Sequence, residues 1–279
     1  MIRWVFNHSN WIPNKPEWLR AMGSISVDEQ KRISGLAYQR DAKAALAGRL
    51  MMRKVVAYQF SIASKEIIFE RSKKGRPFLR YPEEDFDFNI SHNGNLTVLT
   101  AAHRLKTGVD VMHTLSPPDG YTAEQYFQKL RSILTESEWD FIYQVNSESE
   151  RIKRFYRHWC LKEAYAKAIG KGVGIDFSKL ECRLSTPEHP QPWCSSLGQN
   201  PYNWQFEEHW LQNSHVCAIA WYGDTLPSFN CFATFTEMKF EDLIMETEII
   251  HKASSDIWEI FKNKDKQPPT SRLPLPVDL

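Results

Sequence analysis

Hydrophobic residues along this chain follow two periods, one typical of strands and one typical of helices. In residues 86–91, the apolar Phe86, Phe88 and Ile90 alternate with polar residues. This alternation predicts a half-buried strand, and Asn93-Gly94 after it predicts a tight turn into a returning strand. Further strands are predicted at 2–6, 67–70, 96–102, 108–112, 180–184, 204–207 and 215–221, helices at about 40–58, 122–133, from 135 and at about 150–170, and a loop at 186–203.

The two halves of this pattern share one order, in which a long helix is combined with short strands that form a meander. We therefore predict an α+β, pseudo-duplicated fold with two similar halves, each with a long helix packed on a small antiparallel sheet, and a cleft between them. A linker is predicted at 114–121, where Pro and Gly are frequent. The predicted units are 1–113, 114–228 and a C-terminal extension at 229–279, in which the Pro-rich residues 262–279 are expected to be disordered.

The helix at about 150–170 is apolar on nearly all sides, which is typical of a buried helix. Glu163 shares its side of this helix with Trp159 and Cys160, so it is a carboxylate among apolar neighbours. An unpaired buried carboxylate is costly, and Glu163 therefore needs a cation, either Lys167 one turn further on or a metal ion. The alternative is a surface ion pair between Glu163 and Lys167, which is common at this spacing.

The composition is that of a globular protein with a real core, since 42% of the 279 residues are hydrophobic and 25% are charged. No apolar run is long enough to predict a membrane-spanning helix, and the N-terminus does not resemble a signal peptide. The five Cys are odd in number, scattered and without a C-x-x-C pair, which argues against both a zinc site and a disulfide framework. We expect a reduced, cytoplasmic setting.

The net charge is only +1, but residues 31–80 hold thirteen Lys or Arg against three Asp or Glu. A solvated helix surface would explain this stretch, and so would an anionic small ligand or an acidic protein partner. No nucleic-acid-binding motif accompanies the basic residues, so we predict neither a nucleic-acid nor a membrane partner.

Three short segments carry the candidate chemistry: Asn89-Ile90-Ser91-His92, Gly108-Val109-Asp110-Val111 and Trp159-x-x-Lys162-Glu163-Ala164-x-x-Lys167. Each alone is ambiguous, because a His at a strand end is often structural and an Asp in a strand often marks an edge or a bulge. In this order and spacing they resemble the Sfp-type 4′-phosphopantetheinyl transferases, most closely the animal branch of that family. The resemblance extends from Arg3-Trp4 to about Trp221 and includes Arg40-Asp41-Ala42-Lys43-Ala44-Ala45 and Lys74-Gly75-Arg76-Pro77.

The resemblance implies an enzyme, a holo-acyl-carrier-protein synthase, that moves the 4′-phosphopantetheine arm of coenzyme A onto a serine of an apo carrier protein and releases 3′,5′-ADP. It implies three catalytic residues, namely Asp110, Glu163 and Lys167. Asp110 and Glu163 would hold Mg²⁺ on the pyrophosphate, as suits a hard cation. Glu163, or a water that it positions, would be the base for the serine, and Lys167 would neutralise phosphate charge.

The resemblance also implies where coenzyme A binds. Its phosphates would be held by Lys167 and by the segment Asn89, Ile90, Ser91 and His92. Its 3′-phosphate and adenine end would be held by Arg32 and by the turn Arg71, Ser72, Lys73, Lys74, Gly75 and Arg76. Positive charge and the backbone donors of a Gly turn suit a phosphate without any analogy.

One position departs from the family pattern, because many members have a Glu two residues after the strand Asp and this chain has Met112. We therefore expect two carboxylate ligands, with water or pyrophosphate completing the magnesium shell. The expected partners are apo carrier proteins such as acyl carrier protein, fatty acid synthase and aminoadipate-semialdehyde dehydrogenase-type domains, and the expected state is a monomer. The alternatives are a non-catalytic coenzyme A- or nucleotide-binding protein and a magnesium-dependent coenzyme A phosphohydrolase.

Overall fold

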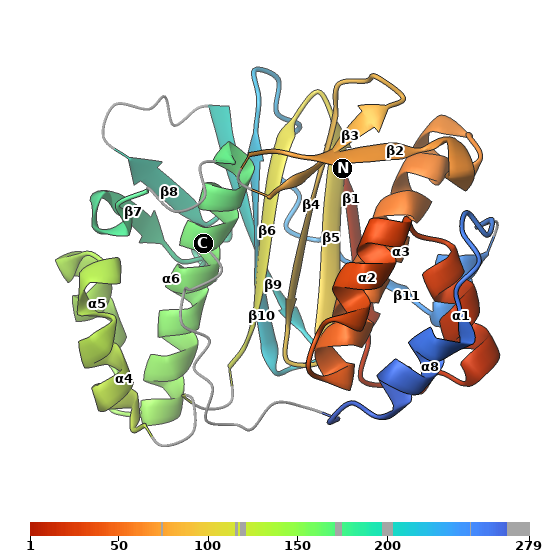
Figure 1. Ribbon diagram of the computed structural model, residues 1–279. Helices are drawn as coiled ribbons and strands as arrows, with labels where there is room; N and C mark the ends of the chain where they lie inside the picture. Colours follow the sequence, from red (N-terminus) through yellow and green to blue (C-terminus); the bar gives the residue numbers. More distant parts are fainter. Residues whose placement is uncertain are drawn as a thin grey trace.

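The computed structural model describes residues 1–73, 75–114, 117, 121–170, 175–196, 203–245 and 247–266. Antiparallel strands form the centre of the molecule, with the long helices α3 (Gln39–Phe60) and α6 (Glu148–Ile169) on either side of them (Figure 1). Each of these helices has 22 residues, α3 packs on β4 and β5, and α6 packs on β6 and β10. The α+β prediction, with one long helix per half, is confirmed.

The remaining elements include the other predicted strands and several elements that the sequence pattern did not predict. Up to the second sheet they are β1 (Ile2–Asn7), α1 (Lys15–Gly23), α2 (Val27–Ser34), β2 (Ile68–Arg71), β3 (Pro77–Tyr81), β4 (Phe86–Asn93) and β5 (Leu96–His103). After them come β6 (Lys106–His113), α4 (Ala123–Lys129), α5 (Glu136–Tyr143), β7 (Leu180–Arg183), β8 (Trp193–Ser196), β9 (Trp204–Leu211) and β10 (His215–Tyr222). The chain continues through β11 (Thr236–Met238), α7 (Phe240–Ile244) and α8 (Ser255–Lys262).

The strands form a sheet of order β11-β1-β5-β4, a second of order β6-β10-β9, and two hairpins, β2-β3 and β7-β8. Side chains of β4 join the two larger sheets. The backbone N–H groups of Thr107, Val109 and His113 donate to Asp87 (2.9 Å), Asn89 (3.0 Å) and Asn93 (2.9 Å), respectively. The polar face of the alternating strand therefore meets β6, whereas Phe86 and Phe88 enter the core of the first half.

The predicted division at residue 113 would assign β6 to the N-terminal half. Its backbone hydrogen bonds, however, are with β10, with Asp110 opposite Ala218. β6 also packs along α6, the helix that carries Glu163. Asp110 and Glu163 are therefore held by the same packing unit, and not by opposite sides of the seam between the sheets.

Local signals explain where α6 begins and ends. The Ser147 side chain accepts a hydrogen bond from the N–H of Glu150, which caps the first turn. At the other end Gly170 has a φ of +68°, a left-handed conformation that favours glycine, and α6 ends at Ile169, close to the predicted end at about 170. Thr135 and Glu138 form a capping box at the start of α5, where the sequence predicts a helix from 135.

Four expectations about the second half and the extension are wrong, and one of them is the argument against a disulfide. The loop predicted at 186–203 contains β8, and Cys182 is joined to Cys194 by a disulfide between β7 and β8. The helix predicted at 122–133 ends at Lys129 and is followed by a 3-10 turn. Residues 262–266, expected to be disordered, lie against the start of α3, where the N–H of Gln39 donates to the carbonyl of Asp265 (2.8 Å). The rest of that prediction, 267–279, lies outside the described residues.

The C-terminal extension packs on the N-terminal half. Its strand β11 runs parallel to β1 at the edge of the first sheet, with Thr236 opposite Trp4. Phe240 stacks on Trp11, with ring centroids 4.6 Å apart, and Phe261 stacks on Trp18 at 3.7 Å. Among the described helices, none is long and apolar enough to cross a membrane.

Candidate active site

A close crossing of β6 and α6 brings the two predicted carboxylates together. At Gly108, a Cβ atom would lie 2.0 Å from the carbonyl oxygen of Ala164 and 2.4 Å from the nitrogen of Ala168. Only a residue without a side chain permits this approach. Two residues further along β6, Asp110 lies close enough to Glu163 for its charge to raise the pKa of Glu163.

Asp110 is held by Lys167 and Ser91. Its Oδ1 lies 2.7 Å from the Nζ of Lys167 and accepts a hydrogen bond from the hydroxyl of Ser91 at 2.9 Å. Lys167 also lies 3.0 Å from the Ser91 hydroxyl and donates to the carbonyl of Val109 at 3.1 Å. Burial alone would lower the pKa of Lys167, but the carboxylates of Asp110 and Glu163 raise it above its usual value. Lys167 is therefore a cation at neutral pH.

Glu163 is 7% exposed, so the surface ion pair with Lys167 considered from the sequence is wrong. Burial, followed by the charge of Asp110, raises the pKa of Glu163 to about 7, although Lys167 opposes this effect. Glu163 Oε1 and Asp110 Oδ2 are both buried without a hydrogen-bond partner. Unpartnered buried carboxylate oxygens are costly, and a hard divalent cation is the ligand that would satisfy both.

The donor set supports two protein ligands and not three. Among the described residues, no group of three His, Cys, Asp or Glu side chains could hold a metal ion. Met112 is 7% exposed and packs in the core of the second half. The residues present fit Mg²⁺ with Asp110 and Glu163 as protein ligands, because this ion commonly retains water and substrate oxygens in its shell.

The segment 89–92 divides into two pairs. Ser91 is part of the Asp110 cluster, and His92 is exposed at the end of the strand. Desolvation by the surrounding groups and then the charge of Lys167 lower the pKa of His92 below its usual value, so it is neutral at pH 7. Asn89, in contrast, accepts from the backbone of β6, and Ile90 packs at Gly48, where a Cβ would lie 3.3 Å from its Cγ2. Asn89 and Ile90 thus hold the strand in place.

Three arginines surround one carboxylate at the start of the predicted 3′-phosphate region. Glu29 lies 2.5 Å from Arg71, 3.0 Å from Arg49 and 3.9 Å from Arg32. One anion cannot neutralise three guanidinium groups, so this cluster has positive charge to spare for a phosphate. Arg49 was missed from the sequence, although the basic stretch 31–80 contains it. Because Arg49 also contributes to the lowered pKa of His92, it connects this cluster to the carboxylate site.

Arg76, which the resemblance implies as a residue that holds the 3′-phosphate end of coenzyme A, makes several contacts within the protein. Its guanidinium donates to Asp87 (2.8 Å) and to the carbonyls of Thr107 (3.1 Å) and Lys167, so it ties β4 and β6 to the end of α6. The turn before it is tight, since Gly75 has a φ of +82° and Ser72 accepts from the N–H of Arg76 at 3.2 Å. Ser72 and Lys73 belong to this turn, and Lys74 lies outside the described residues.

Comparisons with known proteins decide the family. Residues 9–104 match the model of the N-terminal 4′-phosphopantetheinyl transferase domain, and residues 106–220 match the 4′-phosphopantetheinyl transferase superfamily. A Xenopus laevis L-aminoadipate-semialdehyde dehydrogenase-phosphopantetheinyl transferase is 36% identical over 96% of this chain and 93% of its own. The chain belongs to the 4′-phosphopantetheinyl transferases. The resemblance identified from the sequence is thus confirmed, and this is a family of enzymes.

Other relatives of this phosphopantetheinyl transferase agree. The Rattus norvegicus protein of the same name is 36% identical over 93% of this chain and 90% of its own. Among solved structures, the Bacillus anthracis holo-(acyl-carrier-protein) synthase in complex with coenzyme A (3′,5′-ADP) is 19% identical and covers 43% of this chain and 96% of its own, with a TM-score of 0.33. That structural likeness is too weak to support any argument about the site.

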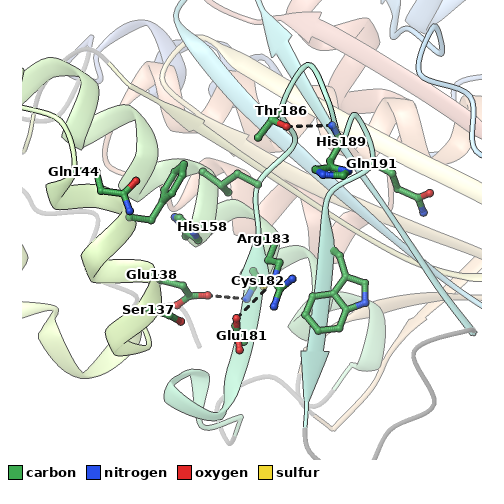
Figure 2. A pocket seen from close by; sticks show the side chains of 13 residues that line it. Ser137, Glu138, Gln144, His158, Glu181, Cys182, Arg183, Thr186, His189 and Gln191 are labelled. Carbon is green, nitrogen blue, oxygen red and sulfur yellow. Dashed lines mark hydrogen bonds and ion pairs between the residues drawn. The ribbon is translucent and has the colours of Figure 1, made fainter.

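A cavity in the second half of the transferase is separate from these carboxylates. It has a volume of about 850 Å³ and lies between α5, α6 and the β7–β8 hairpin (Figure 2). Its residue on α6 is His158, five positions before Glu163 and therefore about 140° around the helix from it. The cavity thus opens on another face of α6.

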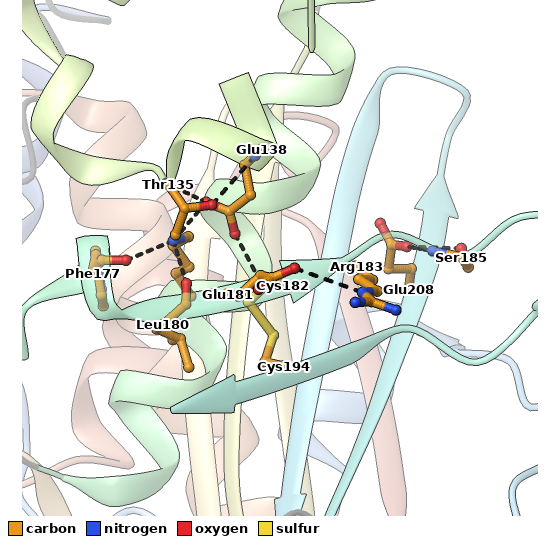
Figure 3. Close-up of a disulfide and its surroundings, with 11 residues drawn as sticks. Thr135, Glu138, Phe177, Leu180, Glu181, Cys182, Arg183, Ser185, Cys194 and Glu208 are labelled. Atoms are coloured by element: carbon orange, nitrogen blue, oxygen red, sulfur yellow. Dashed lines mark hydrogen bonds and ion pairs between the residues drawn. A yellow bond between two sulfur atoms is a disulfide. The ribbon is translucent and has the colours of Figure 1, made fainter. Parts of the chain in front are cut away.

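Lys162, next to Glu163 in the motif, is a structural residue. Its Nζ lies 2.8 Å from Glu138 and donates to the carbonyls of Phe177 (2.7 Å) and Leu180 (2.6 Å). Glu138 in turn accepts from the N–H of Cys182 at 2.8 Å, next to the disulfide of Cys182 with Cys194 (Figure 3). This fully buried network attaches α6 to α5 and to the disulfide-linked hairpin, and so it fixes the rotation of the helix that presents Glu163.

Proposed function

We propose that this transferase moves the 4′-phosphopantetheine arm of coenzyme A onto a serine of apo carrier proteins and releases 3′,5′-ADP. The observation that supports this most strongly is the pair of unpartnered buried oxygens, Asp110 Oδ2 and Glu163 Oε1, beside the cation Lys167. The names of the animal relatives make aminoadipate-semialdehyde dehydrogenase-type domains candidate acceptors, together with acyl carrier protein and fatty acid synthase.

Each residue of the site has a role in this proposal. Asp110 and Glu163 would hold Mg²⁺, which when bound neutralises charge on the pyrophosphate. Glu163, or a water that it positions, accepts the proton of the serine hydroxyl as the serine oxygen bonds to the phosphorus of the pantetheine phosphate. The bond from that phosphorus to the bridging oxygen breaks, and Lys167 stabilises the charge that develops on the phosphate oxygens.

Coenzyme A, the donor, would extend from this site toward Glu29 and the three arginines around it. Ser91 and His92 lie at the carboxylates, and a neutral His92 can still donate one hydrogen bond to a phosphate oxygen. Arg32, Arg49 and Arg71 would bind the 3′-phosphate, and Ser72, Lys73, Lys74 and Gly75 would support them from the adjoining turn. Arg76, Asn89 and Ile90, expected from the resemblance to contact the donor, are proposed to position the strands that carry these groups.

All of these groups come from one chain, so we expect a monomer to be active. A cytoplasmic location stays a prediction. The scattered cysteines were one argument for a reduced, cytoplasmic setting, and the Cys182–Cys194 disulfide removes that argument.

One incubation tests the proposed function. Protein, coenzyme A, Mg²⁺ and an apo acyl carrier protein should give a carrier heavier by one phosphopantetheine, attached at serine, and an equal amount of 3′,5′-ADP. Asp110→Asn and Glu163→Gln should each abolish the product, whereas Glu148→Gln, an exposed carboxylate at the start of α6, should not. Release of 3′,5′-ADP without carrier would instead identify a phosphohydrolase, and no product with measurable coenzyme A binding would identify a binding protein.

A further inference from the structure

A second, smaller cavity lies beside the Glu29 cluster and is partly built by the C-terminal extension. Its volume is about 400 Å³, within the range of ligand sites. Glu29, Arg49 and Arg71 form an ion-paired part of its lining, and the other charged lining residues are Asp28, Arg53, Lys65 and Glu70. Ile250 and His251 line it from the extension, far from the three ion-paired residues along the chain.

The backbone of this part of the extension is firmly held. The N–H groups of Ile250 and His251 donate to the carbonyl of Gly23 at 2.8 and 3.1 Å. The carbonyl of His251 accepts from the side chain of Gln30 at 3.1 Å. Gly23 permits this approach, because a Cβ there would lie 3.3 Å from Ile249 and 3.4 Å from the His251 carbonyl. The two cavity-lining side chains are therefore presented on a fixed backbone.

The chemistry of the lining is that of a site for a flat heterocycle joined to a phosphate. Met52, Ile67 and Phe69 supply apolar surface for the ring faces, and Ser26, Asp28 and His251 supply polar groups for its edge. The guanidinium of Arg53 donates to the backbone carbonyls of Ser64 and Ile67. Since these acceptors are neutral, they do not offset the positive charge that Arg53 brings to the cavity. A purine with a neighbouring phosphate matches both features, and a phosphate alone would leave the apolar surface without a partner.

We propose that the C-terminal extension forms one wall of the donor site, with Ile250 packing on the adenine ring of coenzyme A and His251 hydrogen-bonding its edge. This rests on the proposed function, which supplies coenzyme A as the donor. The 3′-phosphate then lies at Arg49 and Arg71, and the pyrophosphate extends toward His92 and Lys167. The extension, which lies outside both family-matched segments, thereby sets the specificity for the base.

Isothermal titration calorimetry of 3′,5′-ADP with the full chain tests whether Ile250 and His251 contribute to the donor site. Ile250→Ala and His251→Ala should each weaken binding about fivefold to tenfold, the effect expected when a few apolar contacts or one hydrogen bond are lost. Ile249→Ala is the matched control, because Ile249 is exposed, adjacent and not part of the cavity lining, and it should bind as the wild type does. Ribose 3,5-bisphosphate, which lacks the base, should bind all four proteins equally.

The outcomes separate this inference from the proposed function. If the wild type does not bind 3′,5′-ADP, the proposed donor is wrong. If the wild type binds it and both variants bind it equally well, the donor stands and the extension is not part of its site. Photolabelling of the wild type with 8-azido-3′,5′-ADP gives an answer that needs no variant: label on the peptide containing 247–266 supports the inference, and label confined to other peptides overturns it.

Discussion

At the residue scale, this transferase places ordinary side chains in surroundings that change their properties. Glu163 is 7% exposed and lies close to a second carboxylate, Asp110, so burial and that charge raise its pKa to about 7. Lys167, four residues away on the same helix, is directed to Asp110. The pairing of Lys167 with the strand carboxylate leaves Glu163 available for a metal ion and for the acceptor serine.

The raised pKa of Glu163 predicts how the metal-free protein responds to pH. The folded value of about 7 exceeds the usual 4.5, so this group weakens folding progressively from about pH 4.5 to pH 7, by up to about 3 kcal/mol. Glu163→Gln should remove this dependence and make the metal-free protein more stable than the wild type at pH 8. Chemical denaturation in EDTA at pH 5 and pH 8 measures both effects. A variant that loses stability equally at both pH values would contradict the assignment.

His92 is predicted to bind the donor and not to act as the base. It is exposed at a strand end and neutral at pH 7, since desolvation and Lys167 lower its pKa. His92→Ala should raise the apparent KM for coenzyme A about tenfold, the loss of roughly one strong hydrogen bond, with a smaller effect on kcat. His103→Ala, at the end of the neighbouring strand, serves as a control. An unchanged KM with a lower kcat and a lost acidic limb of the pH profile would make His92 the base instead.

At the element scale, the site depends on the crossing of β6 and α6. Gly108 removes the side chain that would separate them, Arg76 ties the end of α6 to β4 and β6, and Lys162 and Glu138 hold α6 on its other side. The polar face of β4 completes this arrangement, because Asp87, Asn89 and Asn93 accept from the backbone of β6. Several residues of the family motifs thus contribute to the site by holding its helix and strands in position.

Gly108→Ala should displace β6 from α6, because the new Cβ would lie 2.0 Å from a backbone oxygen and cannot be accommodated by a rotamer change. We expect a loss of about 3 kcal/mol or more in the free energy of unfolding and a large loss of transfer activity. Gly35→Ala is the control: its Cβ would meet only ordinary contacts at 3.5 Å, so stability should change by less than about 1 kcal/mol. Equal stability of the two variants would show that β6 is not tightly held.

At the scale of the whole molecule, a buried ion pair links the first sheet to the second. Arg3 on β1 donates to Glu207 on β9 at 2.7 and 2.5 Å, and His209 and Trp221 also contact that carboxylate. Glu207 is 3% exposed. The C-terminal extension adds a further link within the first half, through β11 at its sheet edge.

The lowered pKa of Glu207 predicts that the free energy of unfolding decreases at acidic pH. Burial alone would raise its pKa, but hydrogen bonds from Arg3 and His209 lower it to about 2. Its contribution is therefore complete above about pH 5 and is lost as the pH falls toward 2, by up to about 3 kcal/mol. Glu207→Gln should reduce stability at pH 7 and flatten the stability–pH curve between pH 5 and 2, whereas the exposed Glu237→Gln should do neither. A variant curve parallel to that of the wild type would rule out this role.

The sequence by itself determined the elements and the residue types of the site. The pattern of residues along the chain located α3, α6, β4, β5 and the start of α5 to within a few residues, because these features depend on neighbours in the chain. Three motifs were enough to name the family. The metal ligands and the donor-binding residues implied by the same motifs stay predictions, and so do the unit boundaries that were placed at the predicted linker.

Only the tertiary structure decided which of those residues face each other. Several contacts join residues that are not neighbours in the sequence. Lys167 contacts Asp110, Arg76 and Asn89 hold strands, and Cys182 bonds to Cys194. The extension, in turn, lines a cavity at Glu29. Such pairs are set by how sheets and helices pack, and no local period encodes that packing. The shifted pKa of Glu163 has the same origin, since burial and a neighbouring carboxylate exist only after the chain has folded.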